Sequence, residues 1–570
     1  MQYGTRFLLP AGLGVTILAA CGGSSTGPEP AKLTLTSVTP STGTIGTELT
    51  LFGTNFHTGA TVQLDALEAD SVQVVSSTTI YVLVPSTVVK DHAYAVQVSN
   101  TDGTQARLAG AFTPVGPLLR FVNGATKPSG NVGSTVIVEG KAFGDHQGTG
   151  QVLFSNGAGG TIAATIASAG DWTNTFIVTT VPAGTASGPV AVQTGLGTSD
   201  SLAFTVATNA AFSPSTITWT STTALPVGLS GHSATFAVVG GATTTSNVVY
   251  VAGGADSART PRSDVYYATI QPTGQLSAWT TTTSLPAAVA FHAAVVATGS
   301  NSRVKGVAGY LYILGGATDA GGTPANTIYR GAIDSTGAVT AWTTVLPTLP
   351  AAVHSAGAVI FRGDLYIAGG SRTGNAPTTA VYRSRIDSTG ALGAWVAEPV
   401  LPFARAYAGF GQFGEYLYAL GGDSATVTPN DSGYTNNATK VDQIAYIRIN
   451  LRTGALIGPS WTVNPSLLTK AMSKHTAVVA GGNVLVTGGL YNGAASGSSE
   501  ESYAQINSDG TIGSLLGATG VHTISSAGGG NLFNHAALTY VDANGAAHVL
   551  IVGGDDVNTP GTKHRQVWFY

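Results

Sequence analysis

Short runs of alternating apolar and polar residues fill most of the chain. Thr47-Glu-Leu-Thr-Leu-Phe and Ser134-Thr-Val-Ile-Val-Glu are two examples, and segments rich in glycine, threonine and proline separate such runs. Alternation directs one face of a strand into a core. Glycine at the breaks supplies the positive φ that tight turns need. The pattern therefore predicts an all-β protein.

The predicted strands fall first into two similar segments, residues 33–115 and 116–207. In each segment three glycines and a phenylalanine recur at spacings of 3, 7 and 3 residues, and each segment later has a strand ending in Val-Pro. The recurring residues are Gly43, Gly46, Gly53 and Phe56 in the first segment, and Gly130, Gly133, Gly140 and Phe143 in the second. The two segments resemble the IPT/TIG family of immunoglobulin-like domains. The resemblance implies two β-sandwiches that act as spacers or protein-contact modules.

A longer repeat begins near residue 210. Six apolar strands each end in a glycine pair, and each is followed by a loop, a strand with an aromatic residue and usually a tryptophan. The glycine pairs are Gly253-Gly254, Gly315-Gly316, Gly369-Gly370, Gly421-Gly422, Gly488-Gly489 and Gly553-Gly554. A repeat of this length is typical of a solenoid or propeller. The recurring glycine pairs, aromatic residues and tryptophans resemble those of the kelch repeat, whose unit is a four-stranded propeller blade.

The two ends of the repeat region complement each other. The chain reaches Tyr570 with only three strands of a sixth blade, and the segment around Trp219 carries the sequence of the missing fourth strand. Pairing of these segments would leave no open seam in the ring. We therefore expect two immunoglobulin-like β-sandwiches followed by a six-bladed kelch-type β-propeller, residues 210–570, closed by its N-terminal strand. We expect the long segments after the glycine pairs to form one face of the propeller, opposite the face at which the sandwich segments join it.

The first twenty residues read as an export signal. Arg6 precedes the apolar stretch from Phe7 to Ala20, which is too short for a good membrane span. It ends in Leu18-Ala-Ala-Cys21, which resembles the lipobox of bacterial lipoproteins. An ordinary signal peptide with an incidental cysteine is the alternative, but Cys21 is the only cysteine, and lipidation explains a single cysteine in an exported chain. Residues 1–20 would be a signal peptide and residues 21–32 a flexible tether.

The resemblance to lipoproteins implies attachment to the outer membrane of the bacterial cell envelope through lipid on Cys21, because glycine follows that cysteine. No other segment is apolar enough to cross a bilayer. Charged residues make up 9% of the chain and the net charge is −4. A chain without a basic face is not expected to bind nucleic acid.

An aromatic or imidazole group occurs near the start of the first strand of each predicted blade. These residues are His232, His292, His354, Tyr407, His475 and His535. The first strand is innermost in kelch blades, so the group could ring the channel mouth and bind a metal, an anionic sugar or a carboxylate. The alternative is structural: such a histidine packs between blades and donates a hydrogen bond to a neighbouring carbonyl.

No catalytic set and no cofactor is predicted. The leading hypothesis is a surface lipoprotein that binds a glycan or a protein through the loop-rich propeller face. An exported sugar-modifying enzyme that resembles the kelch-type sialate epimerases is an alternative. It would need acid/base groups and an arginine converging on the channel, for which Arg262, Arg383, Arg385 and Arg405 are candidates. A purely structural envelope protein is the third possibility.

Overall fold

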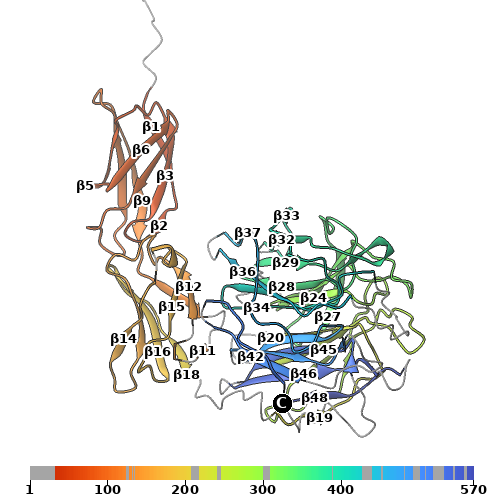
Figure 1. Cartoon of the computed structure of the whole chain (residues 1–570). Helices are drawn as coiled ribbons and strands as arrows, with labels where there is room; N and C mark the ends of the chain where they lie inside the picture. The colour runs from red at the N-terminus through yellow and green to blue at the C-terminus, as the bar shows by residue number, and fades with distance from the viewer. Residues whose placement is uncertain are drawn as a thin grey trace, which may run out of the picture. The chain divides into compact units, whose positions relative to one another are not determined.

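The computed structural model describes the chain except for residues 1–31, 123–127, 131, 134, 168, 207–216, 241–244, 299–307, 388, 427–438, 451–452, 481, 492–500, 508, 518–531, 543–545 and 557–561. The described residues are almost entirely strands and turns (Figure 1), as predicted. The described helical elements are two short 3-10 turns, η1 (Ala169–Asp171) and η4 (Thr373–Asn375). The chain divides into two compact units, the first ending at Val115 and the second beginning at Gly116.

The first unit is a sandwich of two mainly antiparallel sheets. One sheet has the order β1 (Thr34–Thr39), β3 (Glu48–Thr54), β7 (Thr79–Leu83) and β6 (Ser71–Ser76). The other has the order β2 (Thr42–Gly43), β9 (Gln105–Pro114), β8 (Tyr94–Ser99), β4 (Thr61–Leu64) and β5 (Leu67–Glu68). Alternate residues such as Leu49, Leu51, Val62 and Leu64 are buried between the sheets, as the alternation predicts.

The second unit begins with a sandwich of similar strand order, in which the first sheet has three described strands instead of four. Its first sheet runs β10 (Leu118–Val122), β12 (Thr135–Lys141), β15 (Phe176–Thr180). Its second runs β11 (Ser129–Gly130), β18 (Leu202–Val206), β16 (Gly188–Thr194), β13 (Gln151–Ser155), β14 (Thr161–Ala163), with β17 (Gly197–Thr198) beside β16. The repeated glycine and phenylalanine spacing therefore corresponds to a repeated topology.

The Gly-x-x-Phe spacing has a steric cause in both sandwiches. A Cβ atom added at Gly53 would lie 1.9 Å from the carbonyl oxygen of Thr34 and 2.6 Å from the ring of Phe56. One added at Gly140 would lie 2.0 Å from the Leu118 oxygen and 2.4 Å from the ring of Phe143. Only glycine admits this approach of the strand and the aromatic ring.

The rest of the second unit contains, among the described residues, six four-stranded antiparallel sheets, an arrangement consistent with the blades of a β-propeller. Numbered by first strand, blades one to three are β20 (Ser233–Gly240), β21 (Thr245–Ala252), β22 (Val265–Thr269), β23 (Thr280–Thr281); β24 (Ala293–Thr298), β25 (Gly309–Leu314), β26 (Ile328–Ile333), β27 (Val339–Thr344); and β28 (Gly357–Phe361), β29 (Asp364–Ala368), β32 (Val381–Arg385), β33 (Val396–Ala397).

Blades four to six complete the set. They are β34 (Gly409–Phe413), β35 (Tyr416–Leu420), β36 (Ile444–Ile449), β37 (Leu456–Val463); β39 (Thr476–Ala480), β40 (Asn483–Thr487), β42 (Glu501–Gln505), β43 (Leu516–Gly517); and β45 (Ala536–Val541), β46 (Ala547–Val552), β48 (Val567–Phe569), β19 (Thr220–Thr222). The first strands of neighbouring blades contact one another in order, and β45 contacts β20, so the described blades form a closed ring.

The predicted ring closure is confirmed at the level of strand pairing. Strand β19 pairs antiparallel with β48, with Thr220 opposite Phe569 and Thr222 opposite Val567. The sixth blade therefore takes three strands from the end of the repeat region and one from its start. This arrangement covers the edge of β48, which would otherwise be open to pairing with another chain.

Two aromatic columns of the sequence connect adjacent blades. The hydroxyls of Tyr250, Tyr312, Tyr366 and Tyr418 donate forward, each to the carbonyl of a turn glycine in the next blade, at 2.5 to 3.0 Å. The indole N–H groups of Trp279, Trp342 and Trp461 donate backward, each to a backbone carbonyl of the preceding blade, at 2.8 to 2.9 Å. Each of these tyrosines and tryptophans thus combines a buried or partly buried ring with one polar contact to a neighbouring blade.

Short two-stranded pairings follow the glycine pairs. They are β30 (Ser371–Arg372) with β31 (Ala376–Pro377), β38 (Met472–Ser473) with β41 (Leu490–Tyr491), and β44 (Leu532–Phe533) with β47 (Asp555–Asp556). In the other blades, single bridges such as Ser230 with Ala255 and Ala406 with Asp423 are found at the same place. In every blade, the segment that connects the second and third strands therefore begins beside the residues just before the first strand. We call the face formed by these segments the loop-rich face.

Candidate binding face of the propeller

A closed ring of six backbone hydrogen bonds surrounds the propeller axis in the described residues. Each blade contributes the residue two positions before its first strand, whose N–H donates to the carbonyl of its counterpart in the preceding blade, at 2.6 to 3.1 Å. The six residues, which we call the axial residues, are Gly231, Phe291, Ser355, Tyr407, Lys474 and Asn534. All six have a positive φ of 50° to 58°, which is uncommon for residues other than glycine.

A second set of six hydrogen bonds links the same blades. The N–H of the second glycine of each pair donates to a carbonyl in the next blade, for example Gly254 to Val289 and Gly554 to Leu229, at 2.8 to 2.9 Å throughout. Each such bond contributes on the order of 1 kcal/mol to stability. Together the two sets fix the blades around the axis.

The axial side chains fill the centre of the ring rather than leaving it open. Phe291 and Tyr407 are less than 8% exposed and meet edge to face with ring centroids 6.0 Å apart. The Lys474 ammonium lies 5.0 Å from the centroid of the Tyr407 ring and is also buried. The axis at this level is therefore closed by two aromatic rings and an aliphatic lysine stem.

The six residues predicted as one column lie at three different positions. His232, His292, His475 and His535 each come one residue after an axial residue, His354 comes one residue before Ser355, and Tyr407 is itself axial. The six residues therefore do not lie at equivalent positions around the axis, because the residue with positive φ, and not the residue type, marks the same place in each blade. In the third and fourth blades, Ala356 and Ala408 occupy the histidine position.

The four equivalent histidines pack between blades. A methyl group added at Gly253 would lie 2.8 Å from the ring of His292, and one added at Gly553 would lie 2.7 Å from the ring of His232. Gly421 and Gly488 stand in the same relation to His475 and His535. The first glycine of a pair therefore leaves room for the imidazole of the following blade, as the structural alternative describes.

Their electrostatics match this packing. Desolvation is the main cause that lowers the pKa of His232 and His475 to about 4 and the pKa of His292 and His535 to about 3. Nε2 of the neutral His535 ring lies 2.9 Å from the hydroxyls of both Thr476 and Thr487. These rings are neutral at pH 7 and are enclosed by protein.

His354 has a separate environment on the loop-rich face. Its Nε2 lies 2.8 Å from Oδ1 of Asn375, its Nδ1 lies 3.0 Å from the Ser355 hydroxyl, and its ring is 6.1 Å from the ring of Tyr407. Desolvation lowers its pKa, and Lys474 adds to this effect. The structure thus brings His354, Tyr407 and Lys474 together near the axis but separates them from the other four histidines.

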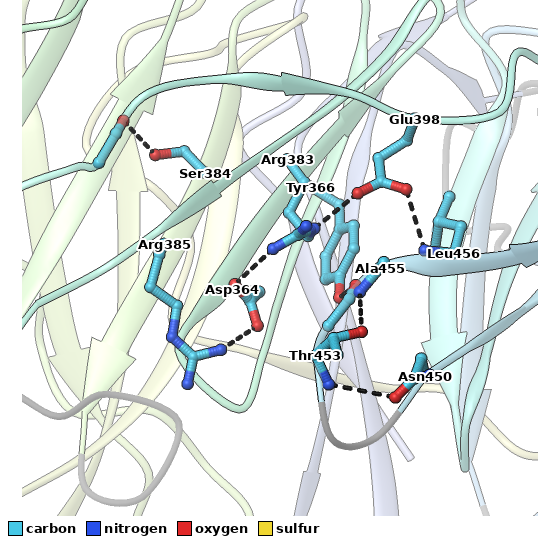
Figure 2. Close-up of polar contacts among 12 residues, drawn as sticks. Asp364, Tyr366, Arg383, Ser384, Arg385, Glu398, Asn450, Thr453, Ala455 and Leu456 are labelled. Carbon is cyan, nitrogen blue, oxygen red and sulfur yellow. Dashed lines mark hydrogen bonds and ion pairs between the residues drawn. The ribbon is translucent and has the colours of Figure 1, made fainter. Parts of the chain in front are cut away.

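Two of the four candidate arginines belong to a buried ionic network (Figure 2). Arg383 donates to Glu398 at 2.6 Å and to Asp364 at 3.3 Å, and Arg385 donates to the other oxygen of Asp364. Glu398 also accepts the backbone N–H of Leu456 at 2.9 Å, which ties the third blade to the fourth. Burial raises the pKa of Asp364, although both arginines oppose this effect. These arginines stabilise a blade junction.

The other two arginines are also engaged. Arg262 pairs with Asp264 at 2.8 Å and with Asp256 at 3.5 Å. Arg405 is 1% exposed, and one of its guanidinium nitrogens donates to the carbonyls of Ala419, Gly421 and Gln443 at 3.2 Å each. Desolvation lowers its pKa to about 10, so it remains charged at neutral pH.

A buried acid lies at the closing strand. Trp219 donates its indole N–H to Oε1 of Glu501 in the fifth blade, whereas Trp279, Trp342 and Trp461 donate to backbone carbonyls. Glu501 is 1% exposed, and its Oε2 has no hydrogen-bond partner among the described residues. Burial raises the pKa of Glu501 to about 8, and the Trp219 bond only partly offsets it.

Replacing Glu501 with Gln should therefore stabilise the protein above pH 8. Between about pH 4.5 and 8, the Glu501 carboxyl is protonated in the folded wild type and ionised in the unfolded chain. The stability that comes from the neutral carboxyl is fully present below this range, and it is lost as the pH rises through the range. Urea unfolding of E501Q at pH 5 and pH 8.5 should show the gain only at the higher pH. An equal effect at both pH values would contradict the assignment. Gln505, exposed on the same strand, gives the matched control Q505E.

Several predictions fall outside the described residues. Cys21 and the signal and tether segments lie there, as do parts of the loops at 427–438 and 492–500. Within the described part of the chain, no helix has the length and apolar character of a membrane span. The same residues contain no cluster of three or more His, Cys, Asp or Glu side chains arranged to hold a metal ion.

No sequence pattern pointed directly to the axial residues. Glycine, phenylalanine, serine, tyrosine, lysine and asparagine share no chemistry, and what they share is a backbone conformation. The available signal was their constant position, two residues before the first strand of each blade. Aligning on that place rather than on histidine would have found Lys474 and Asn534.

The chain was compared with known families, curated proteins and solved structures. The IPT/TIG domain family matches residues 33–113. No curated protein matches the chain. One of the similar solved structures, titled "Structure of YjhT", is 14% identical, covers 61% of this chain and 95% of that chain, and has a TM-score of 0.42. Residues 33–113 of this all-β chain therefore form an IPT/TIG domain.

Proposed function

We propose that the protein is an envelope-anchored surface lipoprotein that binds a glycan or a protein through the loop-rich face of its propeller. The observation that carries the proposal is the filled axis. Phe291, Tyr407 and Lys474 close the centre, which leaves the exposed connecting segments as the surface available to a ligand on this face. Such segments on a rigid scaffold are where binding residues usually lie.

The proposal includes the finer parts of the architecture. The ring would be a kelch-type propeller, residues 116–207 would be a second IPT/TIG-type domain, and the two sandwiches would act as a spacer from a lipid on Cys21. Several acyl chains on that cysteine would give a stable anchor, because each buried methylene contributes roughly 0.8 kcal/mol.

We do not propose the sugar-modifying alternative. That reaction would require an arginine and acid/base groups free to meet a substrate at the channel. Arg383 and Arg385 are bound to carboxylates at a blade junction, Arg405 to backbone carbonyls, and Arg262 to Asp264. No specific observation favours a purely structural role either.

A binding screen tests the proposal. Residues 22–570 would be probed against glycan arrays and against purified envelope proteins, with two matched double variants. S257R/T318R places bulky charges in exposed segments of the loop-rich face, and T273R/S335R does so in exposed turns between the third and fourth strands. We expect a ligand whose binding is weakened at least tenfold by the first variant and unchanged by the second. Equal loss in both variants, or loss only in the second, would refute the use of the loop-rich face.

A further inference from the structure

His354 contacts a polar side chain with each of its two ring nitrogens. Its Nδ1 lies 3.0 Å from the hydroxyl of Ser355, and its Nε2 lies 2.8 Å from Oδ1 of Asn375. In an activated serine nucleophile, an imidazole takes the proton of the hydroxyl, and an acceptor oxygen on the far side of the ring holds the imidazole in place. The three side chains have this connectivity, with the roles of the two ring nitrogens exchanged relative to the serine proteases.

The Asn375 amide determines which ring nitrogen of His354 carries the hydrogen. Its Nδ2 donates to the carbonyl oxygen of Gly321 at 3.3 Å, which turns Oδ1 toward the imidazole. An amide oxygen accepts and cannot donate, so Nε2 of His354 is the donor in this contact. Burial lowers the pKa of His354, and the ring is neutral at pH 7. Nδ1 therefore keeps its lone pair and accepts the hydroxyl hydrogen of Ser355.

Backbone contacts of the third blade hold the three groups together. The backbones of His354 and Ser371 exchange two hydrogen bonds, at 3.0 and 2.7 Å, and Asn375 lies four residues further on, in η4. Ser355 belongs to the closed ring of axial residues. It is partly exposed, whereas His354 is 1% exposed. Of the two, the serine is therefore the residue that a reagent in solution can reach.

Other pairs of imidazole and hydroxyl in the propeller do not have the third member. Nε2 of His292 lies 2.9 Å from the hydroxyl of Ser233, and Nε2 of His535 lies 2.9 Å from that of Thr476. Among the described residues, Nδ1 of His292 and Nδ1 of His535 are buried without a hydrogen-bond partner. No contact at Nδ1 therefore orients these rings or selects the nitrogen that carries the hydrogen.

We propose that Ser355 is a nucleophile that takes acyl groups from small esters, with His354 as its general base and Asn375 as the residue that positions the imidazole. Only small esters are expected, because the rings of Phe291 and Tyr407, the axial neighbours of Ser355, close the axis. The inference goes beyond the proposed function and does not depend on it.

The reaction has two balanced steps. In the first step, Oγ of Ser355 bonds to the ester carbonyl carbon and its proton passes to Nδ1 of His354. The bond from that carbon to the alcohol oxygen then breaks, and the imidazole returns the proton to the departing alcohol. In the second step, water attacks the acyl-serine by the same route and releases the carboxylic acid, which regenerates the hydroxyl.

Two small serine-directed probes test the proposal on residues 22–570. Methanesulfonyl fluoride transfers its sulfonyl group to a nucleophilic hydroxyl with loss of fluoride, and p-nitrophenyl acetate releases p-nitrophenol on acyl transfer. We expect one methanesulfonyl group per chain, located on Ser355 by peptide mapping, and turnover of p-nitrophenyl acetate. Absence of label on Ser355 at millimolar reagent overturns the proposal, and so does labelling confined to other residues. The mapping uses the wild-type chain and needs no variant to fold.

Variants separate the three roles. S355A should lower p-nitrophenol release at least tenfold, whereas S233A, the matched control at the pair without a third member, should leave it unchanged. H354Q should slow labelling of Ser355 roughly a hundredfold, the lower range for loss of a general base. N375A should slow labelling as well, and N375D, which keeps an acceptor oxygen, should restore most of the rate. Unchanged release in S355A, or equal rates in N375A and N375D, overturns the proposal.

Discussion

Acidification from pH 6.5 towards pH 4 is expected to unfold the propeller cooperatively, with the uptake of about four protons. His232, His292, His475 and His535 have folded-state pKa values of about 3 to 4 because they are desolvated between blades. The unfolded chain takes up protons on these rings near pH 6.5, and the folded chain does not. Stability is thus present above pH 6.5 and is lost as pH falls toward the folded pKa values.

The expected size of this effect is large. Each histidine contributes a slope of up to roughly 1.4 kcal/mol per pH unit, so four acting together give about 5 kcal/mol per pH unit. The charges that face these rings modify the value: Asp555 near His232 favours protonation, and Arg405 near His475 opposes it. Glu501 contributes with the opposite sign over the same range.

Urea unfolding at intervals between pH 7.5 and pH 4.5 measures the slope. H292Q should reduce the proton uptake by about one, because its wild-type ring is buried against Gly253 and Ser233. H146Q, at an exposed histidine of the second sandwich, is the control and should leave the slope unchanged. A wild-type uptake of less than one proton below pH 6.5 would show that the histidines are not buried as neutral rings.

Replacement of Arg383 with Met should cost roughly 3–5 kcal/mol of unfolding free energy at pH 8, the range for removing one partner of a buried ion pair. The variant leaves two carboxylates, Asp364 and Glu398, which are 2% and 4% exposed, without their shared cation. Arg385 still faces Asp364, and the Leu456 N–H still faces Glu398, which favours the lower end of that range.

The pH dependence distinguishes lost charge from lost packing. In R383M the buried carboxylates should take up protons more readily, so the destabilisation should shrink between pH 8 and pH 5. R262M is the matched control, since Arg262 is 38% exposed and its pairs should contribute no more than about 1 kcal/mol. If R383M and R262M lose the same stability, or if the loss in R383M is independent of pH, the charges of the network do not contribute to the stability of the fold.

Much of the fold follows from local sequence. The alternation that buries Leu49 and Leu51, the Gly-x-x-Phe spacing at Gly53 and the glycine pairs such as Gly253-Gly254 each correspond to a steric requirement that only certain residues meet. Pairing of the segment near Trp219 with the last strand also followed, because each blade needs four strands and the pattern shows which one is displaced.

The candidate site was less accessible to the same reasoning. Histidine recurs for packing, so a column drawn through histidines slipped by two residues at His354 and by one residue at Tyr407. The Arg383 network joins residues of separate strands and blades, and its contacts arise only when the blades pack.

Sharing the sixth blade between distant segments has a consequence for biosynthesis. Strand β19 is made before all the other strands of the ring, whereas its partner β48 is made after them. During translation, the earlier blades can form their own hairpins, but β19 has no edge to join until the last strand is made. The final joining of the circle is therefore delayed until the whole repeat region is available, and a product interrupted before Val567 would keep two open edges prone to aggregation.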